Sequence, residues 1–332
     1  METRTILCLV LFFATFLQPS LSDSELCHPD DKKVLLEIKK SFNDPDIFVS
    51  WDPKTDCCNW TFITCDDNNR VGELTVVDVD CDLVGPIPPE VGDLPYLLLL
   101  AFIDCPNLTG TIPPAIAKLN NLQGLGFRNT NISGPIPEFI GDFKDLLILD
   151  LGDNCFSGQI PNTIGSLPNL FALNLSFNHF SGPIPGSFEQ ATSGWVENCN
   201  PLARGPTAAT KACAAIRYLR ASQFGKSDLY DLLLSEDLMV FHLGTNSFSG
   251  PIPVAIGTLP QLLWLNLSQN HLSGPIPGSI ASSNNLFTVD LSWNKLDGDA
   301  SVFFASGKST SIIDLSRNLF EFDSQTWISL SS

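Results

Sequence analysis

The stretch LDLGDNCFSG, residues 149–158, decides the fold of this chain. Leu149 and Leu151 alternate with polar residues, which is typical of a half-buried β-strand. Asn154 follows the strand and predicts a turn, because its side-chain amide can hydrogen-bond neighbouring backbone groups. We expect Phe156 to point back into the core. The stretch therefore predicts a short strand, a turn and one buried face.

This unit repeats along the chain. A Gly-x-Ile-Pro tetrapeptide ends each copy, and successive copies are 25, 24, 24 and 24 residues apart, then 68, 24 and 24. One copy cannot bury its own leucine row, whereas stacked copies bury a continuous core, so the repeat predicts a solenoid. The tetrapeptide glycines are Gly85, Gly110, Gly134, Gly158, Gly182, Gly250 and Gly274, and Gly298 continues the register without the Pro-Ile pair.

Stacked strands lie about 4.8 Å apart, so we expect a parallel sheet on the concave side, with a ladder of Asn side chains that satisfies the turns. Side chains between the alternating leucines point out of this sheet, and we predict that this concave strip binds a partner. Exposed Phe177 and Trp293 favour binding, since aromatic residues often anchor interfaces, although single exposed aromatic residues are also common. The Asp residues of this strip either form an acidic binding groove or serve only to keep the protein soluble. The strip comprises Asp104, Arg128, Asp150, Asp153, Asn174, Phe177, His242, Thr245, Asn266, Gln269, Asp290, Trp293, Asp314 and Arg317.

Composition and motifs narrow the class of function. The formal net charge of −18 excludes nucleic acid as a partner, because phosphate binding needs an excess of Lys and Arg. A basic partner would instead be attracted to this surface. The chain has no Gly-x-Ser-x-Gly, His-Glu-x-x-His or phosphate-loop motif, so we expect no enzyme activity. The four His are dispersed, so we also expect no metal and no cofactor.

Residues 1–22 are expected to be a signal peptide. The apolar run 6–17 follows Arg4 and is too short to span a membrane, although a buried helix is the alternative. Loss of Cys8 would leave nine of the ten Cys, so one would be unpaired or intermolecular. No later apolar run reaches membrane length, so we expect a secreted protein of the extracellular space. Sequons predict a glycoprotein modified at Asn59, Asn107, Asn131, Asn174 and Asn266, the last two on the concave strip, where a glycan would obstruct a partner.

Residues 23–69 are expected to form an N-terminal cap. Asp30 and Asp31 precede apolar residues at helical spacing, which predicts a helix covering the open end of the first repeat. Export favours disulfide bonds among the nearby cysteines over free thiols or a zinc site. These cysteines are Cys27, Cys57, Cys58 and Cys65.

These features resemble a known family. Trp51, the stretch DCCNW at 56–60 and Cys65, followed by the repeats, resemble plant extracellular leucine-rich-repeat proteins. Residues 91–97, 106–110, 290–300 and 313–318 resemble polygalacturonase-inhibiting proteins, and the likeness covers roughly residues 25–185 and 240–322.

The resemblance implies an α/β solenoid, a right-handed leucine-rich-repeat superhelix with a curved parallel sheet on its concave face and a helical, disulfide-bonded cap. It implies the pairs Cys27–Cys57 and Cys58–Cys65. It also implies a plant-defence protein of the cell wall that inhibits fungal, and sometimes insect, polygalacturonase through the concave face. The acidity predicts weak pectin binding at most. The strip residues that would face basic side chains of the enzyme are Asp104, Asp150, Asp153 and Asp290.

The chain departs from this family at two places. Repeats occupy residues 70–185 and 239–332, but Gly182 and Gly250 are 68 residues apart, where three units would need 72. Residues 186–238 look irregular and partly helical, and a faulty gene model, retained intron or degenerate stretch is favoured over a true insertion. We expect this segment to interrupt the concave sheet. No C-terminal cap follows, so we expect Ile313, Leu315 and Phe320 to be poorly covered.

Some alternatives stay open from the sequence. An ice-binding role is the second hypothesis, because some plant relatives are antifreeze proteins and a regular polar array can match a crystal lattice. The strip Asp residues and Trp293 interrupt such a flat array. A receptor-like ectodomain fragment is the third hypothesis. The sequence leaves open the pairing of Cys81, Cys105, Cys155, Cys199 and Cys213.

Overall fold

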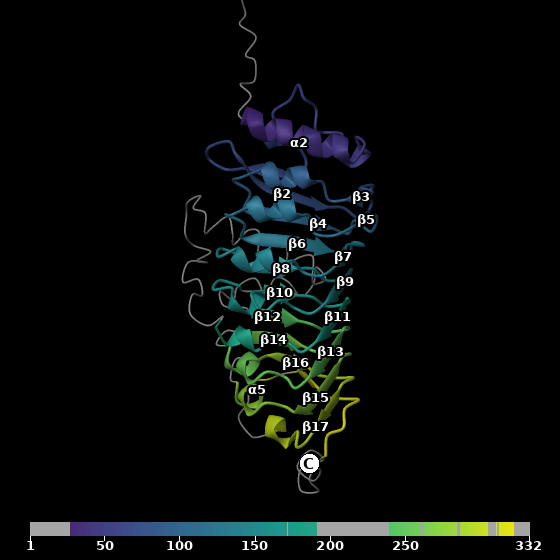
Figure 1. Cartoon of the computed structure of the whole chain (residues 1–332), viewed down its shortest axis with the longest axis vertical. Helices are drawn as coiled ribbons and strands as arrows, with labels where there is room; N and C mark the ends of the chain where they lie inside the picture. The colour runs from purple at the N-terminus through teal and green to yellow at the C-terminus, as the bar shows by residue number, and fades with distance from the viewer. Residues whose placement is uncertain are drawn as a thin grey trace, which may run out of the picture.

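The structure, a computed structural model, describes residues 27–170, 172–190, 239–259, 262–283, 286–304, 310 and 312–321. The predicted signal peptide, Cys199, Cys213 and most of the irregular stretch 186–238 lie outside these residues. The described chain forms an elongated stack of coils, with the N-terminal helix at one end and the last coils at the other (Figure 1). The predicted solenoid is confirmed.

A main sheet of ten described strands runs the length of the stack. Its first two strands are antiparallel, and every later pair is parallel. Leu100 is in register with Leu125, which is in register with Leu149, so the buried leucines of successive coils lie side by side. The strands in spatial order are β1 (Ile63–Cys65), β2 (Val71–Val77), β4 (Leu99–Ile103), β6 (Gly124–Arg128), β8 (Ile148–Asp150), β10 (Ala172–Asn174), β12 (Met239–His242), β14 (Leu262–Asn266), β16 (Thr288–Asp290) and β18 (Ile312–Asp314).

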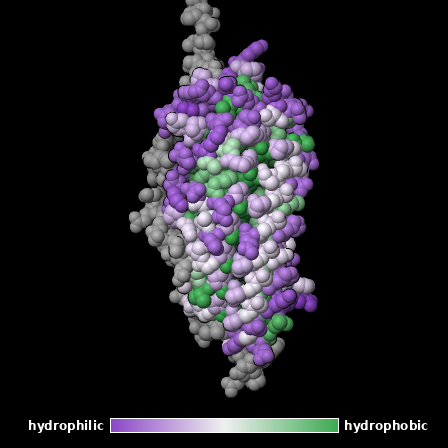
Figure 2. All heavy atoms as spheres, viewed as in Figure 1, coloured by the Kyte–Doolittle hydropathy of each residue, from purple (hydrophilic) through white to green (hydrophobic). Residues whose placement is uncertain are grey.

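A second, shorter sheet follows the Asn turns along another side of the stack (Figure 1). In Figure 2 a pale band of intermediate hydropathy lies on this side, whereas hydrophilic residues gather over the cap. The strands of this sheet are β7 (Ser133–Gly134), β9 (Cys155–Gly158), β11 (His179–Gly182), β13 (Ser247–Gly250), β15 (His271–Pro275) and β17 (Lys295–Asp297), and β3 (Gly85–Pro86) pairs separately with β5 (Leu108–Thr109).

Short helices return the chain to the next coil of the main sheet. They pack closely: a Cβ added to Gly92 would lie 2.2 Å from the carbonyl oxygen of Ala115 in the next coil, so only glycine fits there. These helices are η3 (Pro89–Asp93), η4 (Pro114–Lys118), η5 (Glu138–Asp142), η6 (Ile164–Ser166), η7 (Gly186–Gln190), η8 (Val254–Thr258), α5 (Gly278–Ser282) and η9 (Ser301–Phe304).

The core contains the predicted leucine row and an aromatic stack. Leu149 and Leu151 are fully buried, and so is Phe156. The ring of Phe156 stacks on that of Phe180 at 6.1 Å between centroids, and Phe180 stacks on Phe248 at 6.3 Å. Phe side chains at the same position of successive coils therefore stack on one another, as the repeat predicts.

The predicted Asn ladder is also present. Asn178 donates from Nδ2 to the carbonyl oxygens of Leu151, Leu175 and Ser176, at 2.8, 3.2 and 3.1 Å. Its Oδ1 accepts a hydrogen bond from the backbone N–H of Phe156 at 2.9 Å. Each Asn thus satisfies backbone groups of its own coil and of the preceding one, which are buried and would otherwise be unpaired. Equivalent bonds are made by Asn154, Asn246, Asn270, Asn294 and Asn318.

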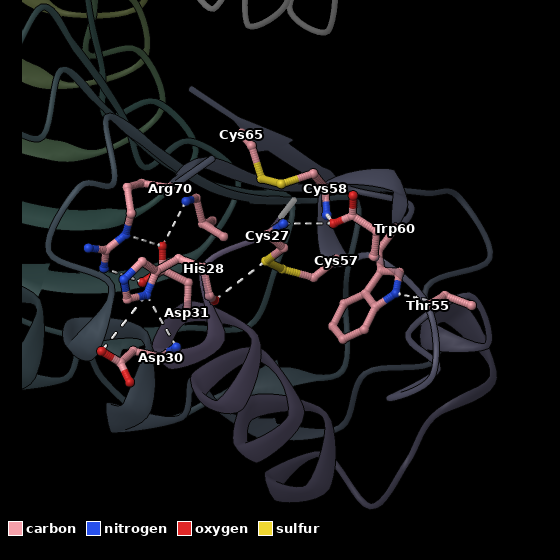
Figure 3. The surroundings of a disulfide bond; sticks show 12 residues. Cys27, His28, Asp30, Asp31, Thr55, Cys57, Cys58, Trp60, Cys65 and Arg70 are labelled. Carbon is pink, nitrogen blue, oxygen red and sulfur yellow. Dashed lines mark hydrogen bonds and ion pairs between the residues drawn. A yellow bond between two sulfur atoms is a disulfide. The ribbon is translucent and has the colours of Figure 1, made fainter. Parts of the chain in front are cut away.

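The cap helix α2 (Pro29–Ser41) covers the N-terminal end of the stack, followed by η1 (Asp46–Phe48) and η2 (Cys57–Asn59). Buried Asp31 accepts two hydrogen bonds from the Arg70 guanidinium, at 2.8 and 2.6 Å, and one from the backbone N–H of Val71 at 2.9 Å (Figure 3). A carboxylate of the first helical turn therefore ties α2 to the start of β2.

The cap cysteines form disulfides, as predicted. Cys27 pairs with Cys57 and Cys58 with Cys65 (Figure 3). Within the described residues, the one group of metal-ligand type is Cys27, Cys58 and Cys65, and all three are in these disulfides. A third disulfide, which the sequence left open, joins Cys81 to Cys105. Among the described cysteines Cys155 is free.

The expected interruption of the main sheet is wrong. Strand β10 pairs directly with β12 across the 68-residue step, with Asn174 opposite His242. The regular coil also extends beyond the predicted boundary at residue 186, because η7 continues to Gln190 and buried Phe188 packs against Phe241 at 5.0 Å. Backbone pairing needs only the neighbouring strand, so the sheet closes over a long connection.

At the other end, Ile313, Leu315 and Phe320 are only partly buried, unlike the leucines of earlier coils.

Asn270→Ala is expected to lower the free energy of unfolding by roughly 3 kcal/mol or more, since each buried polar group left unpaired costs about 1–3 kcal/mol. The variant loses the bond to Leu243 O and the bond from Phe248 N. Urea unfolding followed by circular dichroism measures the change. The control is Lys295→Ala on the exposed surface of β17, expected within about 0.5 kcal/mol of the parent. Equal losses in both variants would contradict the ladder.

Candidate functional site

All of the predicted strip residues except Arg128 fall into two rows along the main sheet. The inner row comes from the strand position between the two buried leucines, and the register places its members opposite one another in consecutive strands. The inner row is Asp150, Asn174, His242, Asn266, Asp290 and Asp314. The sequence-based prediction that these side chains share one face is therefore confirmed by their register.

The outer row comes from the residue just before each ladder position. Every member has a left-handed backbone, with φ between 49° and 59°. Backbone hydrogen bonds run along it from coil to coil, as from Phe177 N to Gly244 O and from Gln269 N to Ser292 O. The outer row is Asp104, Asn129, Asp153, Phe177, Thr245, Gln269, Trp293 and Arg317.

Asn129 was not among the predicted strip residues, because Thr130 replaces the Asn that marks this frame in other coils. The Thr130 hydroxyl donates to Asn154 Oδ1 and so retains a contact to the ladder. Arg128 lies one position earlier, at the end of β6, opposite Ile103. The frame itself, counted 24 residues back from Asp153, is the signal that finds Asn129.

The outer row carries the large exposed side chains. Phe177 is 54% exposed and Trp293 is 58% exposed, and the Arg317 guanidinium lies 5.1 Å from the centre of the Trp293 ring. A left-handed backbone costs a residue with a Cβ about 1–2 kcal/mol, so Phe and Trp are strained there. Strain kept at an exposed aromatic position is a common sign of a functional role.

A polar cluster occupies the N-terminal end of the outer row. Asn129 donates from Nδ2 to Asp104 Oδ1 at 2.8 Å. Partial desolvation raises the pKa of Asp153 above its ordinary value, nearby Arg128 opposes this rise, and Asp104 adds to it. This end of the outer row therefore carries two carboxylates, with one guanidinium nearby.

Two predicted contact residues are not available to a partner. Asp150 is fully buried and Asn174 is 6% exposed. Their side chains hydrogen-bond to each other and to their own turns. Asn174 Nδ2 donates to Asp150 Oδ1 at 2.8 Å, and the Ser176 hydroxyl donates to Asn174 Oδ1 at 2.7 Å. Their predicted exposure is wrong.

An apolar row that sequence analysis did not predict borders these two residues. Its strand members alternate with the core leucines and so lie on the same face of the main sheet as the inner row. Together with Leu147, which precedes β8, they form a second buried cluster. The cluster confines the exposed candidates to the outer row and to the C-terminal strands. Its members are Leu99, Ala101, Ile103, Leu147, Ile148, Ala172 and Val240.

The C-terminal strands enclose a depression of about 420 Å³ on this face. Burial lowers the pKa of His242 to about 4, and the nearby carboxylate of Asp290 opposes this shift. The imidazole is therefore neutral at ordinary pH, and the charges of this depression are those of its carboxylates. The lining residues are His242, Trp264, Leu265, Asn266, Thr288, Val289, Asp290, Ile312 and Asp314.

The predicted glycosylation sites divide by exposure. Asn59, Asn107 and Asn131 are exposed and lie away from the main sheet. Asn266 is half-buried, with its Oδ1 accepting bonds from Ser268 at 2.9 and 2.7 Å. At Asn174 the amide is 6% exposed and leaves no room for a sugar in the folded chain, so we expect this sequon to be unmodified.

Lowering the pH from 6.5 to about 4 is expected to destabilise the fold through His242. In this window the unfolded chain binds a proton that the folded chain does not, so stability is full above pH 6.5 and falls by up to roughly 3 kcal/mol towards pH 4. His242→Gln should flatten this part of a pH series of thermal unfolding. His271→Gln, on the exposed edge of β15, should leave the slope unchanged. An unchanged slope in His242→Gln would refute the assignment.

Glycopeptide mass spectrometry of the protein made in a plant host is expected to show Asn174 unmodified. Asn107 and Asn131 serve as the exposed comparison sites in the same digest. A glycan on Asn174 would mean that its bond to Asp150 does not form in the mature protein.

The chain matches two family descriptions. The Leucine rich repeat N-terminal domain matches residues 28–66, which include the cap helix and its disulfides. The Leucine Rich Repeat matches residues 145–167, 169–191 and 261–283. No helix of the described residues is long and apolar enough to cross a membrane.

Over part of the chain, curated plant proteins are about half identical to it. The polygalacturonase inhibitor of Pyrus communis is 52% identical over 126 residues, which are 38% of this chain and 37% of that protein. Polygalacturonase inhibitor 2 of Arabidopsis thaliana is 52% identical over 117 residues, 34% of this chain and 35% of that protein. The matched segment therefore spans little more than a third of the length of these relatives.

The chain also resembles a solved structure over most of its length. A plant ice-binding protein is 31% identical, with a TM-score of 0.71, over 89% of this chain and 81% of that one. The chain therefore belongs to the plant leucine-rich-repeat proteins that carry an N-terminal leucine-rich-repeat cap, and it is homologous to the polygalacturonase inhibitors.

Proposed function

We propose that this chain is a secreted cell-wall protein that binds a fungal polygalacturonase through the concave strip and blocks pectin cleavage. The supporting observation is the exposed outer row, which combines two strained aromatic residues with charged side chains. We choose a polygalacturonase as the partner because part of the chain is 52% identical to proteins named polygalacturonase inhibitors.

Charge complementarity supports this choice of partner. Pectin is a polyanion, so an enzyme that binds it needs basic side chains around its cleft. A chain of net charge −18 attracts such a cleft over long range, and this attraction weakens as salt rises. Asp104 and Asp153 then lie at one end of the outer row to meet basic side chains. Asp290 lies in the inner row near the other end.

Inhibition of this kind needs no chemistry from the inhibitor. A rigid surface that covers the cleft excludes the polymer, and a few desolvated anchors carry most of the binding energy. Aromatic residues suit this role because they bury a large area and lose little side-chain entropy. Phe177 and Trp293 stand three strands apart, roughly 14 Å along the sheet, so both can contact one enzyme.

Trp293→Gly is expected to weaken inhibition of a sensitive fungal polygalacturonase about 30-fold, the effect of losing one anchor worth roughly 2 kcal/mol. The same change should leave thermal stability equal or higher, because glycine adopts φ 56° without strain. Inhibition constants and melting temperatures are measured on the same preparations. This pairing separates a binding role from a structural one.

The matched control is Val254→Gly, since Val254 is exposed on η8, away from the main sheet, and should leave inhibition unchanged. Phe177→Gly repeats the test at the other anchor. Absence of inhibition by the parent chain across a broad panel of polygalacturonases would remove the proposed function.

Ice binding is a second candidate, favoured by the likeness to a plant ice-binding protein over most of the chain. The second sheet offers a suitable array, because one serine recurs at the same position of successive coils. Crystal shaping and thermal hysteresis, measured on the parent chain, would favour this candidate if inhibition is absent. These serines are Ser133, Ser157, Ser181, Ser249 and Ser273.

A further inference from the structure

A disulfide occupies the place of the Asn ladder in the first two coils. The residue after each outer-row member is the ladder position, and it is Asn in the coils of Asn154 and Asn178. Counted back along the repeat, the same position holds Thr130, Cys105 and Cys81. Cys81 and Cys105 are 24 residues apart and are joined by a disulfide. A covalent bond therefore stands where later coils have hydrogen bonds from a side-chain amide.

This disulfide differs from the other two of the described residues in what it joins. The other two bonds both lie within the cap. The third bond links the turn after β2 to the turn after β4, and these strands are neighbours in the main sheet. Cys105 is fully buried and Cys81 is 6% exposed, so the bond lies inside the stack, as the ladder amides do. It is therefore a covalent contact between two coils.

The length of the turn after β2 explains why a disulfide suits this place. Val77 lies opposite Ile103 at the ends of the two strands, yet Cys81 follows Val77 by four residues and Cys105 follows Ile103 by two. A ladder Asn donates to carbonyl oxygens at fixed places in its own turn and in the preceding turn, as Asn178 does. A longer preceding turn presents its oxygens elsewhere. A disulfide needs only two Cα atoms at a suitable distance, which is 5.0 Å here.

The disulfide also holds the N-terminal end of the outer row. Asp104, the first member of this row, directly precedes Cys105 and has a left-handed backbone with φ 59°. Its N–H donates to the carbonyl oxygen of Arg128 in the following coil at 3.1 Å, and Asn129 donates to its Oδ1. Towards the preceding coil, the residue beside it is held by the disulfide. The position of Asp104 thus depends on a bond that forms only by oxidation.

We propose that the Cys81–Cys105 disulfide is an oxidation-dependent substitute for the Asn ladder, and that it completes the outer row only after export. In the reduced chain the two thiols supply neither the covalent bond nor the amide donors of a ladder residue, so the first coils open more often. Each coil of a solenoid contacts only its neighbours, so this opening stays local. The proposal rests on the proposed function only for export and for the activity that the completed row serves.

The oxidation balances with a partner disulfide. The two thiols lose two protons and two electrons and form the S–S bond. A protein disulfide of the oxidising secretory compartment accepts them and becomes a dithiol.

The test measures hydrogen exchange by mass spectrometry in three full-length chains that all carry Cys155→Ser, which removes the free thiol of the described cysteines. The parent keeps the disulfide. The double-serine chain carries Cys81→Ser with Cys105→Ser and mimics the reduced form. Since the two cysteines are 24 residues apart, loss of the bond is expected to speed exchange in β4 about a hundredfold. Exchange in β14, several coils away, should equal that of the parent.

The third chain, with Cys81→Ser and Cys105→Asn, tests the comparison with the ladder. The new amide can donate to the carbonyl oxygens of Phe102 and Ile103 in its own turn, in the way that Asn178 donates within its turn. Exchange in β4 is expected to be about tenfold slower than in the double-serine chain, the effect of one or two recovered hydrogen bonds. Equal exchange in β4 of these two chains would overturn the substitution for the ladder.

Inhibition constants against a sensitive polygalacturonase are measured on the same preparations. The double-serine chain is expected to inhibit about tenfold more weakly, because a surface that is not held in place must be ordered on binding. Unchanged inhibition by a double-serine chain whose β4 exchanges faster would overturn the link to the outer row. A parent that inhibits no polygalacturonase removes the proposed function, while the exchange data still decide the role of the disulfide.

Two further results would overturn the proposal as a whole. One is exchange in β4 of the double-serine chain at the rate of the parent. The other is an equal rise of exchange in β4 and β14, or a failure of both variants to fold, since the opening would then not be local.

Discussion

The hydrogen bonds of the buried Asn ladder are the constraint on which the rest of the structure depends. Each coil makes a sharp turn after its leucines, and that turn leaves carbonyl oxygens inside the stack without a backbone partner. Asn178 supplies two donors to three of these oxygens, including one in the preceding coil. Hydrophobic burial holds the coils together without direction, whereas the ladder fixes their register. Leucines at the same position of successive coils then pack against one another and exclude water.

The same turn creates the surface on which function is proposed. The residue before each ladder Asn has a left-handed backbone, as Phe177 does before Asn178 and Trp293 does before Asn294, and the ladder amide points inward after it. The side chain of that preceding residue consequently projects into solvent at the same place in every coil. The turn that places the ladder Asn in the core therefore also produces the regular row of exposed side chains. Glycine would adopt this left-handed backbone with less strain, so an aromatic residue there indicates selection for something other than stability.

Much of the fold follows from the spacing of leucines and glycines alone. The period of 24 residues implies stacked coils, and the acidic start of residues 29–41 implies the cap helix. The burial of Asp150 and Asn174, and the bond between their side chains, do not follow from the repeat. The repeat frame shows which residues share a row, but it does not show which of them hydrogen-bond to each other. For the same reason the pocket between Trp264 and Asp314 could not be predicted from one strand at a time.

The continuity of the sheet across the 68-residue step has a consequence for the strip. In a solenoid each coil contacts only its neighbours, so a long connection between two coils costs loop entropy that grows slowly with length and leaves other coils unchanged. What matters is the pairing at the junction, where Leu173 stands opposite Phe241 and Asn174 opposite His242. A slip of one residue there would turn every later inward side chain to the surface. The outer row would then break between Phe177 and Thr245, and no single partner could contact both aromatic anchors. Function on this face therefore depends on one strand pair, β10 with β12, more than on the residues that connect them.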